Sequence, residues 1–262
     1  MTSAPEFLAG TRQPDGSWVF AVGRERHGAF GGAFGGVVSA CCVTAARAVA
    51  PDRAPASLDV NYVRGLPAGT ALVTPTLLHG GRSLTTVSLD MADEAGRLCT
   101  RATVKLVALE ALAAIEHQGA GDGPSALPYE EGTPWRNPPG REVPIVTTFA
   151  PRAAGRDPAA GIATALRVPW DEPGWAAEAA CLAADICVGP PVAGALEQWV
   201  PHPNPDLSLR FASTHMGDEV VGWGRLERVE AGLATVRVEV RSGGVLLAAG
   251  VSMSMLLAGS GS

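Results

Sequence analysis

Apolar and polar positions follow two kinds of pattern along the chain, and both patterns occur twice. Runs of alanine and branched apolar residues with few polar positions predict two helices, over 33–50 and 175–188. Stretches in which apolar and polar residues alternate, bounded by glycine-containing turns, predict strands after each helix. Between the two series lies 111–144, whose Gly and Pro content without periodicity predicts a linker. The patterns therefore predict an N-terminal unit over 1–110 and a C-terminal unit over 145–262.

Strands dominate both predicted units, and residues 1–16 are expected to be a polar lead-in that ends in a turn. The strands are expected over 18–22, 57–63, 71–79, 84–92 and 98–109, and then over 145–149, 161–168, 207–212, 219–229, 233–241 and 245–257. A helix followed by four long strands is the layout of an α+β unit whose antiparallel sheet wraps around the helix. We therefore expect an α+β fold of two tandem units of this kind.

A constant offset of 149 positions relates the two units. Pairs at this offset are Leu58 and Leu207, Gly36 and Asp185, Leu84 and Leu233, and Val87 and Val236. Later turn glycines are 148 positions apart, as expected if one residue was lost in a turn. A constant offset through a helix and three strands indicates a duplicated domain, and a coincidence of similar strand patterns is the alternative.

Composition and charge exclude several classes of partner. Of the 262 residues 47% are hydrophobic and 18% charged, which predicts a compact core. The net charge of −6 comes without a basic cluster, so nucleic acid and membrane surfaces are not expected partners. We find no apolar run of membrane-spanning length and no signal-peptide layout, so the cytoplasm is the expected location.

One acidic residue interrupts the apolar helix predicted over 175–188. Asp185 is expected in its last turn, before Gly189 and Pro190 end the helix, and there its charge would oppose the helix dipole. Burying an unpaired carboxylate costs several kcal/mol or more, so Asp185 is either exposed at a fraying helix end or held for chemistry.

The glycine-rich stretch HGAFGGAFGG precedes the first helix. It lacks the Lys-Ser/Thr of a phosphate-binding loop and the layout of a dinucleotide fingerprint. The N–H groups at such a helix start can bind a carbonyl oxygen or an oxyanion, and Gly35 and Gly36 are the candidates. Close packing of the helix against a sheet explains the glycines equally well.

Cysteine and histidine spacing indicates neither a disulfide framework nor a metal site. The five cysteines lack CxxC spacing and are expected to be reduced and mostly buried. Cys181 shares a helical face with Glu178 and Asp185, but no histidine lies nearby in the helix to activate it as a nucleophile. No metal-ligand spacing occurs, and we expect no cofactor.

Several segments together resemble one family. HGAFGGAFGGVV, LDVNYVRGLPAG and HGGRSLTTVSLDMADEAGRL are similar to the first half of acyl-CoA thioesterase II-like proteins, and LAADICVGP and PDLSLRF are similar to the second. The resemblance covers about 15–109 and 145–258, and it implies a double hotdog fold, which is two tandem hotdog units.

The resemblance also implies which residues hold the hydrolytic water. The family uses a carboxylate on the second helix, a hydroxyl or amide before the next strand, and a glutamine on the last strand. These positions fall on Asp185, Asn204 and Ser252. Asn204 can bind a water through its amide, whereas Ser252 is shorter than glutamine, so an additional water would have to fill the gap.

The function implied is hydrolysis of an acyl thioester carried by CoA or by an acyl-carrier protein. Asp185 would activate water, and Gly35 and Gly36 would polarise the thioester carbonyl. Because the glutamine is missing, a protein that binds an acyl or polyketide-type ligand without hydrolysis is an alternative. A hotdog hydratase or dehydratase is less favoured, since no Asp–Asn–His set lies on the helices. High apolar content in long strands leads us to expect a homodimer or larger assembly.

Overall fold

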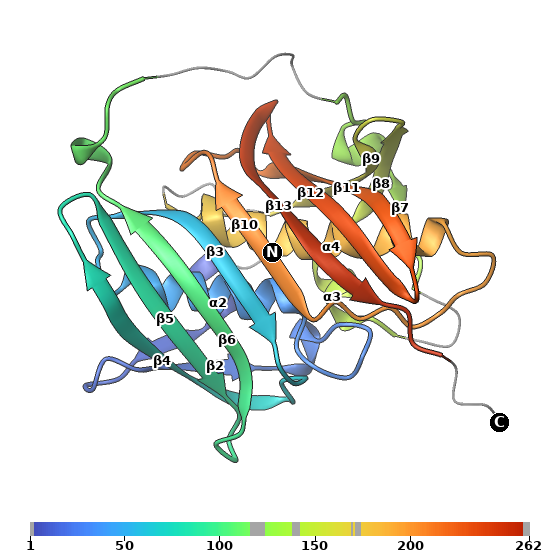
Figure 1. Cartoon of the computed structure of the whole chain (residues 1–262). Helices are drawn as coiled ribbons and strands as arrows, with labels where there is room; N and C mark the ends of the chain where they lie inside the picture. The colour runs from blue at the N-terminus through green and yellow to red at the C-terminus, as the bar shows by residue number, and fades with distance from the viewer. Residues whose placement is uncertain (1–2, 116–123, 138–141, 169, 171–173, 259–262) are drawn as a thin grey trace.

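One antiparallel sheet runs through the whole molecule (Figure 1). The computed structural model of the protein describes residues 3–115, 124–137, 142–168, 170 and 174–258. In that part of the chain the sheet has thirteen strands in the order β1-β2-β4-β5-β6-β3-β10-β13-β12-β11-β9-β8-β7.

The first half of the sheet surrounds helix α2. Its elements are α1 (Ala4–Leu8), β1 (Gly10–Arg12), β2 (Trp18–Val22), α2 (Gly35–Arg47), β3 (Ala54–Tyr62), β4 (Gly69–Gly80), β5 (Leu84–Ala92) and β6 (Leu98–Val107). In β5 buried and partly exposed residues alternate without a break, which explains why the sequence pattern located this strand at its observed bounds.

The second half surrounds helix α4. Its elements are β7 (Thr133–Pro134), α3 (Pro144–Phe149), β8 (Arg152–Asp157), β9 (Gly161–Arg167), α4 (Ala176–Gly194), β10 (Asp206–Phe211), β11 (Glu219–Glu230), β12 (Leu233–Ser242) and β13 (Val245–Met255). Short 3-10 turns lie at Arg24–Arg26, Leu109–Ala111 and Tyr129–Glu131.

The two halves meet where β3 pairs with β10, and the strand register repeats the sequence offset. Leu77 lies opposite Val87 in the first half, and Leu226 lies opposite Val236 in the second. Strand β4 has a bulge directly after Leu77, and its counterpart β11 has a bulge directly after Leu226. The same pairing and the same bulge at an offset of 149 positions are what an internal duplication produces.

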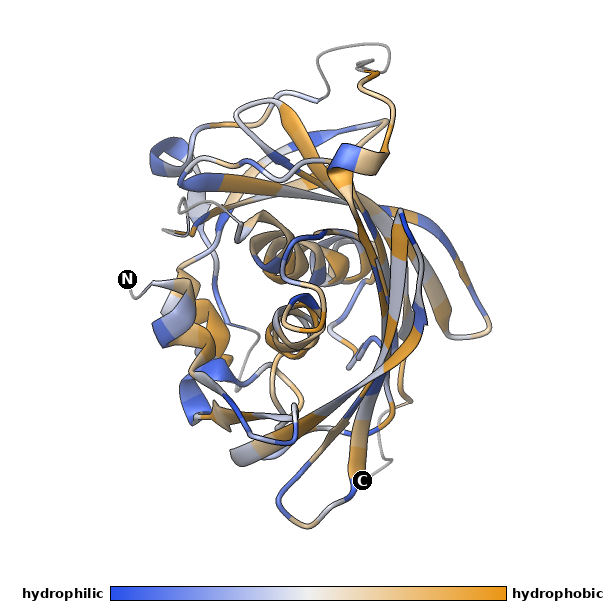
Figure 2. Cartoon of the chain, turned by 90° about the vertical axis from the view of Figure 1, so that its left-hand side faces the viewer, coloured by the Kyte–Doolittle hydropathy of each residue, from blue (hydrophilic) through white to orange (hydrophobic). Residues whose placement is uncertain are grey.

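Both long helices lie inside the curved sheet, as Figure 2 shows with the helices seen nearly end-on. Helix α2 is mostly buried, and α4 has fully buried alanines on several sides because α2 and five strands surround it. The double hotdog predicted from the resemblance is thus confirmed: each half is an antiparallel sheet wrapped around a helix.

The prediction of a strand over 145–149 is wrong, because Pro144–Phe149 form helix α3. Ile145 and Phe149 are both buried and are four residues apart, which is helical spacing. Pro144 suits the first turn of a helix, and Ala150 ends it in the left-handed conformation with φ 43°. The apolar run is too short for its helical spacing to be distinguished from a strand pattern in the sequence.

The predicted end of the second helix is also wrong, since α4 continues through Pro190 and Pro191 to Gly194. Each proline removes one backbone hydrogen bond, which usually ends a helix. Here the last turn is held by packing, because Val192 is fully buried and Gly224 of β11 lies close to the ring of Pro191. Asp185 therefore lies in the middle of α4 and not in its last turn.

Four short elements, α1, β1, β7 and β8, were not predicted from the sequence. Phe7 and Leu8 of α1 are buried, so the expected polar lead-in is part of the core. Of the expected linker 111–144, residues 116–123 and 138–141 lie outside the described part, and β7 within it pairs with β8. By length and composition α4 could cross a membrane, but 83% of the apolar window is buried inside the fold.

Candidate active site

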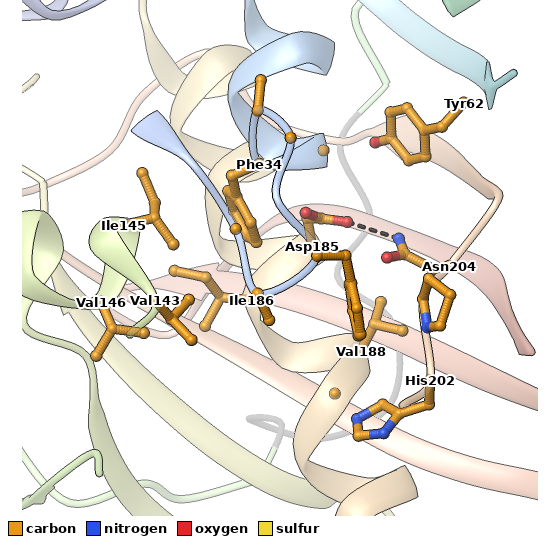
Figure 3. A pocket seen from close by; sticks show the side chains of 18 of the residues that line it. Phe34, Tyr62, Val143, Ile145, Val146, Asp185, Ile186, Val188, His202 and Asn204 are labelled. Carbon is orange, nitrogen blue, oxygen red and sulfur yellow. Dashed lines mark hydrogen bonds between the residues drawn. The ribbon is translucent and has the colours of Figure 1, made fainter. Parts of the chain in front are cut away.

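A cavity of about 860 Å³ opens between the start of α2, the middle of α4 and the segment before β10. Apolar side chains make up most of its wall (Figure 3); they include Phe34, Val143, Ile145, Val146, Ile186 and Val188. The residues at this cavity that offer polar side chains include Tyr62, Arg64, Arg136, Asp185, His202 and Asn204. An apolar cavity with a few convergent polar groups is the usual form of a small-molecule site.

Asp185 is the carboxylate of this cavity, and it sits on the N-terminus of α2. Its Oδ2 accepts a 2.8 Å hydrogen bond from the Gly36 backbone N–H. A helix N-terminus carries partial positive charge, so this position stabilises the carboxylate. The expectation that the charge of Asp185 opposes a helix dipole was therefore wrong, because α4 continues beyond it and α2 begins beside it.

Asn204 is the second predicted site residue, and the structure brings it to Asp185. Its Nδ2 donates to Asp185 Oδ1 over 2.7 Å, the interaction drawn in Figure 3. Asn204 precedes β10, and the adjacent Pro205 carbonyl accepts a 2.8 Å hydrogen bond from the Tyr62 N–H. The backbone of β3 thus holds the Asn204 segment against the cavity.

Burial raises the pKa of Asp185 to about 6. Hydrogen bonds from Asn204 and from the N–H groups of Gly36 and Gly35 favour the charged form and limit this rise. A carboxylate with a pKa near 6 is largely ionised at neutral pH, yet it is basic enough to accept a proton from a water molecule.

Gly35 and Gly36 lie at the start of α2 as predicted, but their environment differs from the one expected. The Gly36 N–H is bonded to Asp185, so it does not face an open site. A Cβ at Gly36 would lie 2.8 Å from the Cys181 carbonyl oxygen and from Leu182 Cα. Gly36 thereby lets the two helices approach closely, whereas the alternative explanation for the glycines was packing of the helix against a sheet.

Ser252, the third predicted site residue, is close to Asn204, whose Nδ2 lies 3.5 Å from the Asp206 carbonyl oxygen that Ser252 also binds. It is 1% exposed and is not among the residues that line the cavity. Its hydroxyl donates to the Asp206 carbonyl oxygen over 2.7 Å, which ties β13 to the start of β10. In this structure Ser252 supports the strand that follows Asn204.

Glu178 and Cys181 share a face of α4 with Asp185, as the sequence spacing indicates. Glu178 is fully buried and pairs with Arg47 of α2 over 2.9 Å. Burial raises the pKa of Cys181 well above its ordinary value, so the thiol stays protonated. This agrees with the expectation that Cys181 is not a nucleophile.

Tyr62 and Ser39 were not predicted as site residues, and their hydroxyl oxygens are 2.8 Å apart beside Asp185. Tyr62 ends β3 and lines the cavity, and Ser39 lies one turn into α2. The two residues are 23 positions apart in the sequence, so no local pattern could have connected them.

The fold and the site together define a double hotdog protein with one carboxylate at the head of an apolar cavity. Residues 24–107 match the family model of the acyl-CoA thioesterase N-terminal domain. No curated protein matches the sequence at a significant level.

Solved structures match nearly the full length of the chain. An acyl-CoA thioesterase II, TesB2, from Mycobacterium marinum is 16% identical with a TM-score of 0.77, and the match covers 98% of this chain and 99% of that one. A proposed thioesterase from Novosphingobium aromaticivorans is 23% identical with a TM-score of 0.80, covering 95% and 99%. A hotdog protein of unknown function from Alicyclobacillus acidocaldarius is 21% identical with a TM-score of 0.79, covering 97% of each chain. These similarities show the fold, and with the matching domain they support a thioesterase II-like hotdog protein, as the sequence resemblance indicated.

Proposed function

We propose that the protein hydrolyses acyl-CoA thioesters with a water molecule activated by Asp185. The observation that supports this most directly is the buried carboxylate at the head of the apolar cavity, held by Asn204 and by the N–H of Gly36. The matching acyl-CoA thioesterase domain gives the substrate class. The apolar wall would receive the acyl chain and would keep the thioester carbon near Asp185.

The Asp185 carboxylate retains an acceptor position that a water molecule can use. Its two oxygens offer about four acceptor positions, and Asn204 and the α2 N–H groups use up to three of them. Asp185 would take a proton as the water oxygen attacks the carbonyl carbon. On collapse of the tetrahedral intermediate the C–S bond breaks, and the protonated Asp185 returns the proton to the leaving thiolate. The products are a carboxylic acid and a free thiol.

Hydrolysis is tested with the purified chain and butanoyl-, octanoyl-, dodecanoyl- and hexadecanoyl-CoA, with release of free thiol as the readout. Asp185→Asn should lower the rate by about 10²-fold or more, the scale of losing a general base. Asp59→Asn, a change to a half-exposed aspartate in β3, is the matched control and should hydrolyse at the wild-type rate. Equal rates for wild type and Asp185→Asn would refute the role of this site.

Loss of activity in Asp185→Asn should not come from unfolding. The folded-state pKa of about 6 is above the ordinary 3.8, so the folded protein keeps this proton over a range in which the unfolded chain has lost it. Stability from Asp185 is therefore lost as pH rises from about 4 to 6, by about 3 kcal/mol at most. Asp185→Asn should therefore raise Tm at pH 7.5. The Asn204 amide can rotate so that its oxygen accepts a hydrogen bond from the new asparagine at position 185.

The same experiment separates the non-hydrolytic alternative. If neither wild type nor variant releases thiol while an acyl-CoA still raises Tm, the protein binds acyl ligands without hydrolysis. Parallel assays with octanoyl-acyl carrier protein would show which thioester carrier is used. We further propose a cytoplasmic location, tested by cell fractionation, and a homodimer or larger assembly, whose test is given below.

A further inference from the structure

A pair of hydroxyl groups at the cavity belongs to the first half of the molecule alone. Tyr62 lies opposite Thr100 in the sheet, and its counterpart Phe211 lies opposite Ala248. At the same offset of 149 positions, Ser39 corresponds to Val188. The fold therefore accepts an apolar pair at these positions, and only the half that presents α2 to Asp185 carries hydroxyl groups there.

Tyr62 Oη and Asp185 Oδ2 flank the same small space next to Gly35. A Cβ built on Gly35 would lie 2.9 Å from each of these two oxygens. Because glycine has no Cβ, both oxygens can pack closely against it, and Gly35, Tyr62 and Asp185 all line the cavity in which a substrate would lie. Figure 3 shows the Tyr62 hydroxyl on the side of its ring that faces Asp185.

In the hydrogen bond between Ser39 and Tyr62 one hydroxyl donates its proton, and the proton of the other hydroxyl remains unused. The burial of Ser39 indicates that Ser39 is the donor. Ser39 is fully buried, and among the described residues its Oγ has no hydrogen-bond partner besides Tyr62. If Tyr62 donated, the Ser39 proton would be left in the core without a new acceptor, at a cost of about 1–3 kcal/mol. Ser39 therefore donates to Tyr62, and the phenol proton is free to point into the cavity.

The backbone N–H groups that were expected to bind the carbonyl oxygen already hold the Asp185 carboxylate. The Gly36 N–H is bonded to Asp185, and the Gly35 N–H also contributes to holding that carboxylate. Burial and the charge of Asp185 raise the pKa of Tyr62 well above its ordinary value, so the phenol keeps its proton at neutral pH. Tyr62 is then the donor in this space that a carbonyl oxygen can still use.

We infer that Tyr62 is a catalytic residue whose hydroxyl donates a hydrogen bond to the thioester carbonyl oxygen, with Ser39 as its positioning residue. The inference rests on the proposed hydrolysis. As water adds to the carbonyl carbon, the π electrons move to the oxygen, and the Tyr62 O–H stabilises the resulting negative charge. Tyr62 keeps its own proton throughout, and the proton from water goes to Asp185.

The test compares Tyr62→Phe with Tyr129→Phe. These are the two tyrosines of the chain. Tyr129 donates to the Ala150 carbonyl oxygen over 2.9 Å and is not among the residues that line the cavity, so its variant is the matched control. With octanoyl-CoA we expect Tyr62→Phe to lower kcat by about 10²- to 10³-fold with little change in KM, the effect of losing one oxyanion donor. Tyr129→Phe should keep the wild-type kcat.

A spectroscopic readout separates polarisation of the carbonyl from a structural effect. The probe is the octanoyl-CoA analogue with CH₂ in place of sulfur and a ¹³C-labelled carbonyl. Its bound C=O stretch should lie at lower frequency in wild type than in Tyr62→Phe. Ser39→Val, which copies the second half, should give an intermediate band with a smaller loss of kcat, and Tm should confirm folding.

The outcomes distinguish the inference from the proposed function. Wild-type hydrolysis by Tyr62→Phe, or a band that does not move, overturns the role of Tyr62. If Asp185→Asn is inactive in that case, the proposed hydrolysis stands. If wild type hydrolyses none of the acyl-CoAs, both fall together.

Discussion

Asn204 is the side chain that most directly counteracts the burial of Asp185. Its hydrogen bond favours the carboxylate, whereas desolvation favours the neutral acid. The side chain of residue 204 therefore sets the pH at which the proposed base becomes available. Hydrolysis should rise with pH through about 6 in the wild type, since only the ionised form can accept a proton.

Asn204→Ala should shift the midpoint of the pH–rate profile for kcat to a value above 6. Removing the amide takes away a bond that lowers the pKa of Asp185, so the ionised form appears at higher pH. The maximal rate should also fall, because the hydrogen bond that orients the Asp185 carboxylate is lost. Steady-state kinetics between pH 5 and 9, corrected for spontaneous thioester hydrolysis, measure both changes.

Ser252→Ala is the control for this experiment. It removes a buried hydroxyl that bonds the Asp206 carbonyl oxygen, so Tm should fall slightly while the midpoint stays near 6. A shifted midpoint in Ser252→Ala, or an unmoved one in Asn204→Ala, would contradict the roles given to these residues.

Asp185 could be found from the sequence because a charge within an apolar helix is conspicuous. Asn204 followed from the family resemblance, and the structure brings it to Asp185. Tyr62 was not found, because a tyrosine at the end of a strand is ordinary and Ser39 meets it only after folding. A local sequence pattern can reveal a charge within an apolar helix, but it cannot reveal a contact between distant segments.

At the scale of elements, the glycines of β11 allow α4 to lie directly on the sheet. A Cβ at Gly224 would overlap the Cys187 carbonyl oxygen, and a Cβ at Gly222 would lie 2.7 Å from that of Ala183. Helix α4 also carries Asp185, so this contact helps to position the site. Small residues on both surfaces make the approach possible.

Gly224→Ala should destabilise the protein by about 1–3 kcal/mol, the usual cost of overpacking a core. Gly80→Ala, at the end of β4, is the matched control, because its Cβ would meet only ordinary contacts at 3.8 Å and beyond. Urea unfolding monitored by circular dichroism measures both variants. Similar midpoints for the two would show that the helix and strand can move apart at no cost.

Most long elements were predictable from the sequence, whereas several short ones were not. The alternation in β5 and the apolar run of α2 span many residues, so a period could be recognised. Helix α3 has six residues, and the last turn of α4 runs through two prolines. In both cases tertiary packing decided the conformation, and this information is absent from a short window of sequence.

At the scale of the whole molecule, the outer surface of the sheet exposes apolar side chains on several strands. Those at least 40% exposed include Leu72, Leu77, Leu78, Val229, Leu233, Val245 and Val251. Such residues on open strands favour association with another chain. We therefore expect a homodimer or larger assembly in solution.

Static light scattering after size-exclusion chromatography should give at least twice the mass of one chain. The assembly should persist on dilution into the low micromolar range if the apolar surface is buried in it. A concentration-independent particle with the mass of a single chain would overturn this expectation.

The contact between Gly36 and Asp185 has a consequence for how such a protein can evolve. These two residues occupy corresponding positions of the two halves, 149 apart, and they touch each other. In a symmetric pair of identical single-unit chains, one codon would determine both positions, and the residue could not be both a glycine for close helix packing and a carboxylate for the site. Fusion of the two copies into one chain removes that constraint. After fusion the two copies can differ: the first keeps the glycine whose N–H binds the carboxylate, and the second supplies that carboxylate.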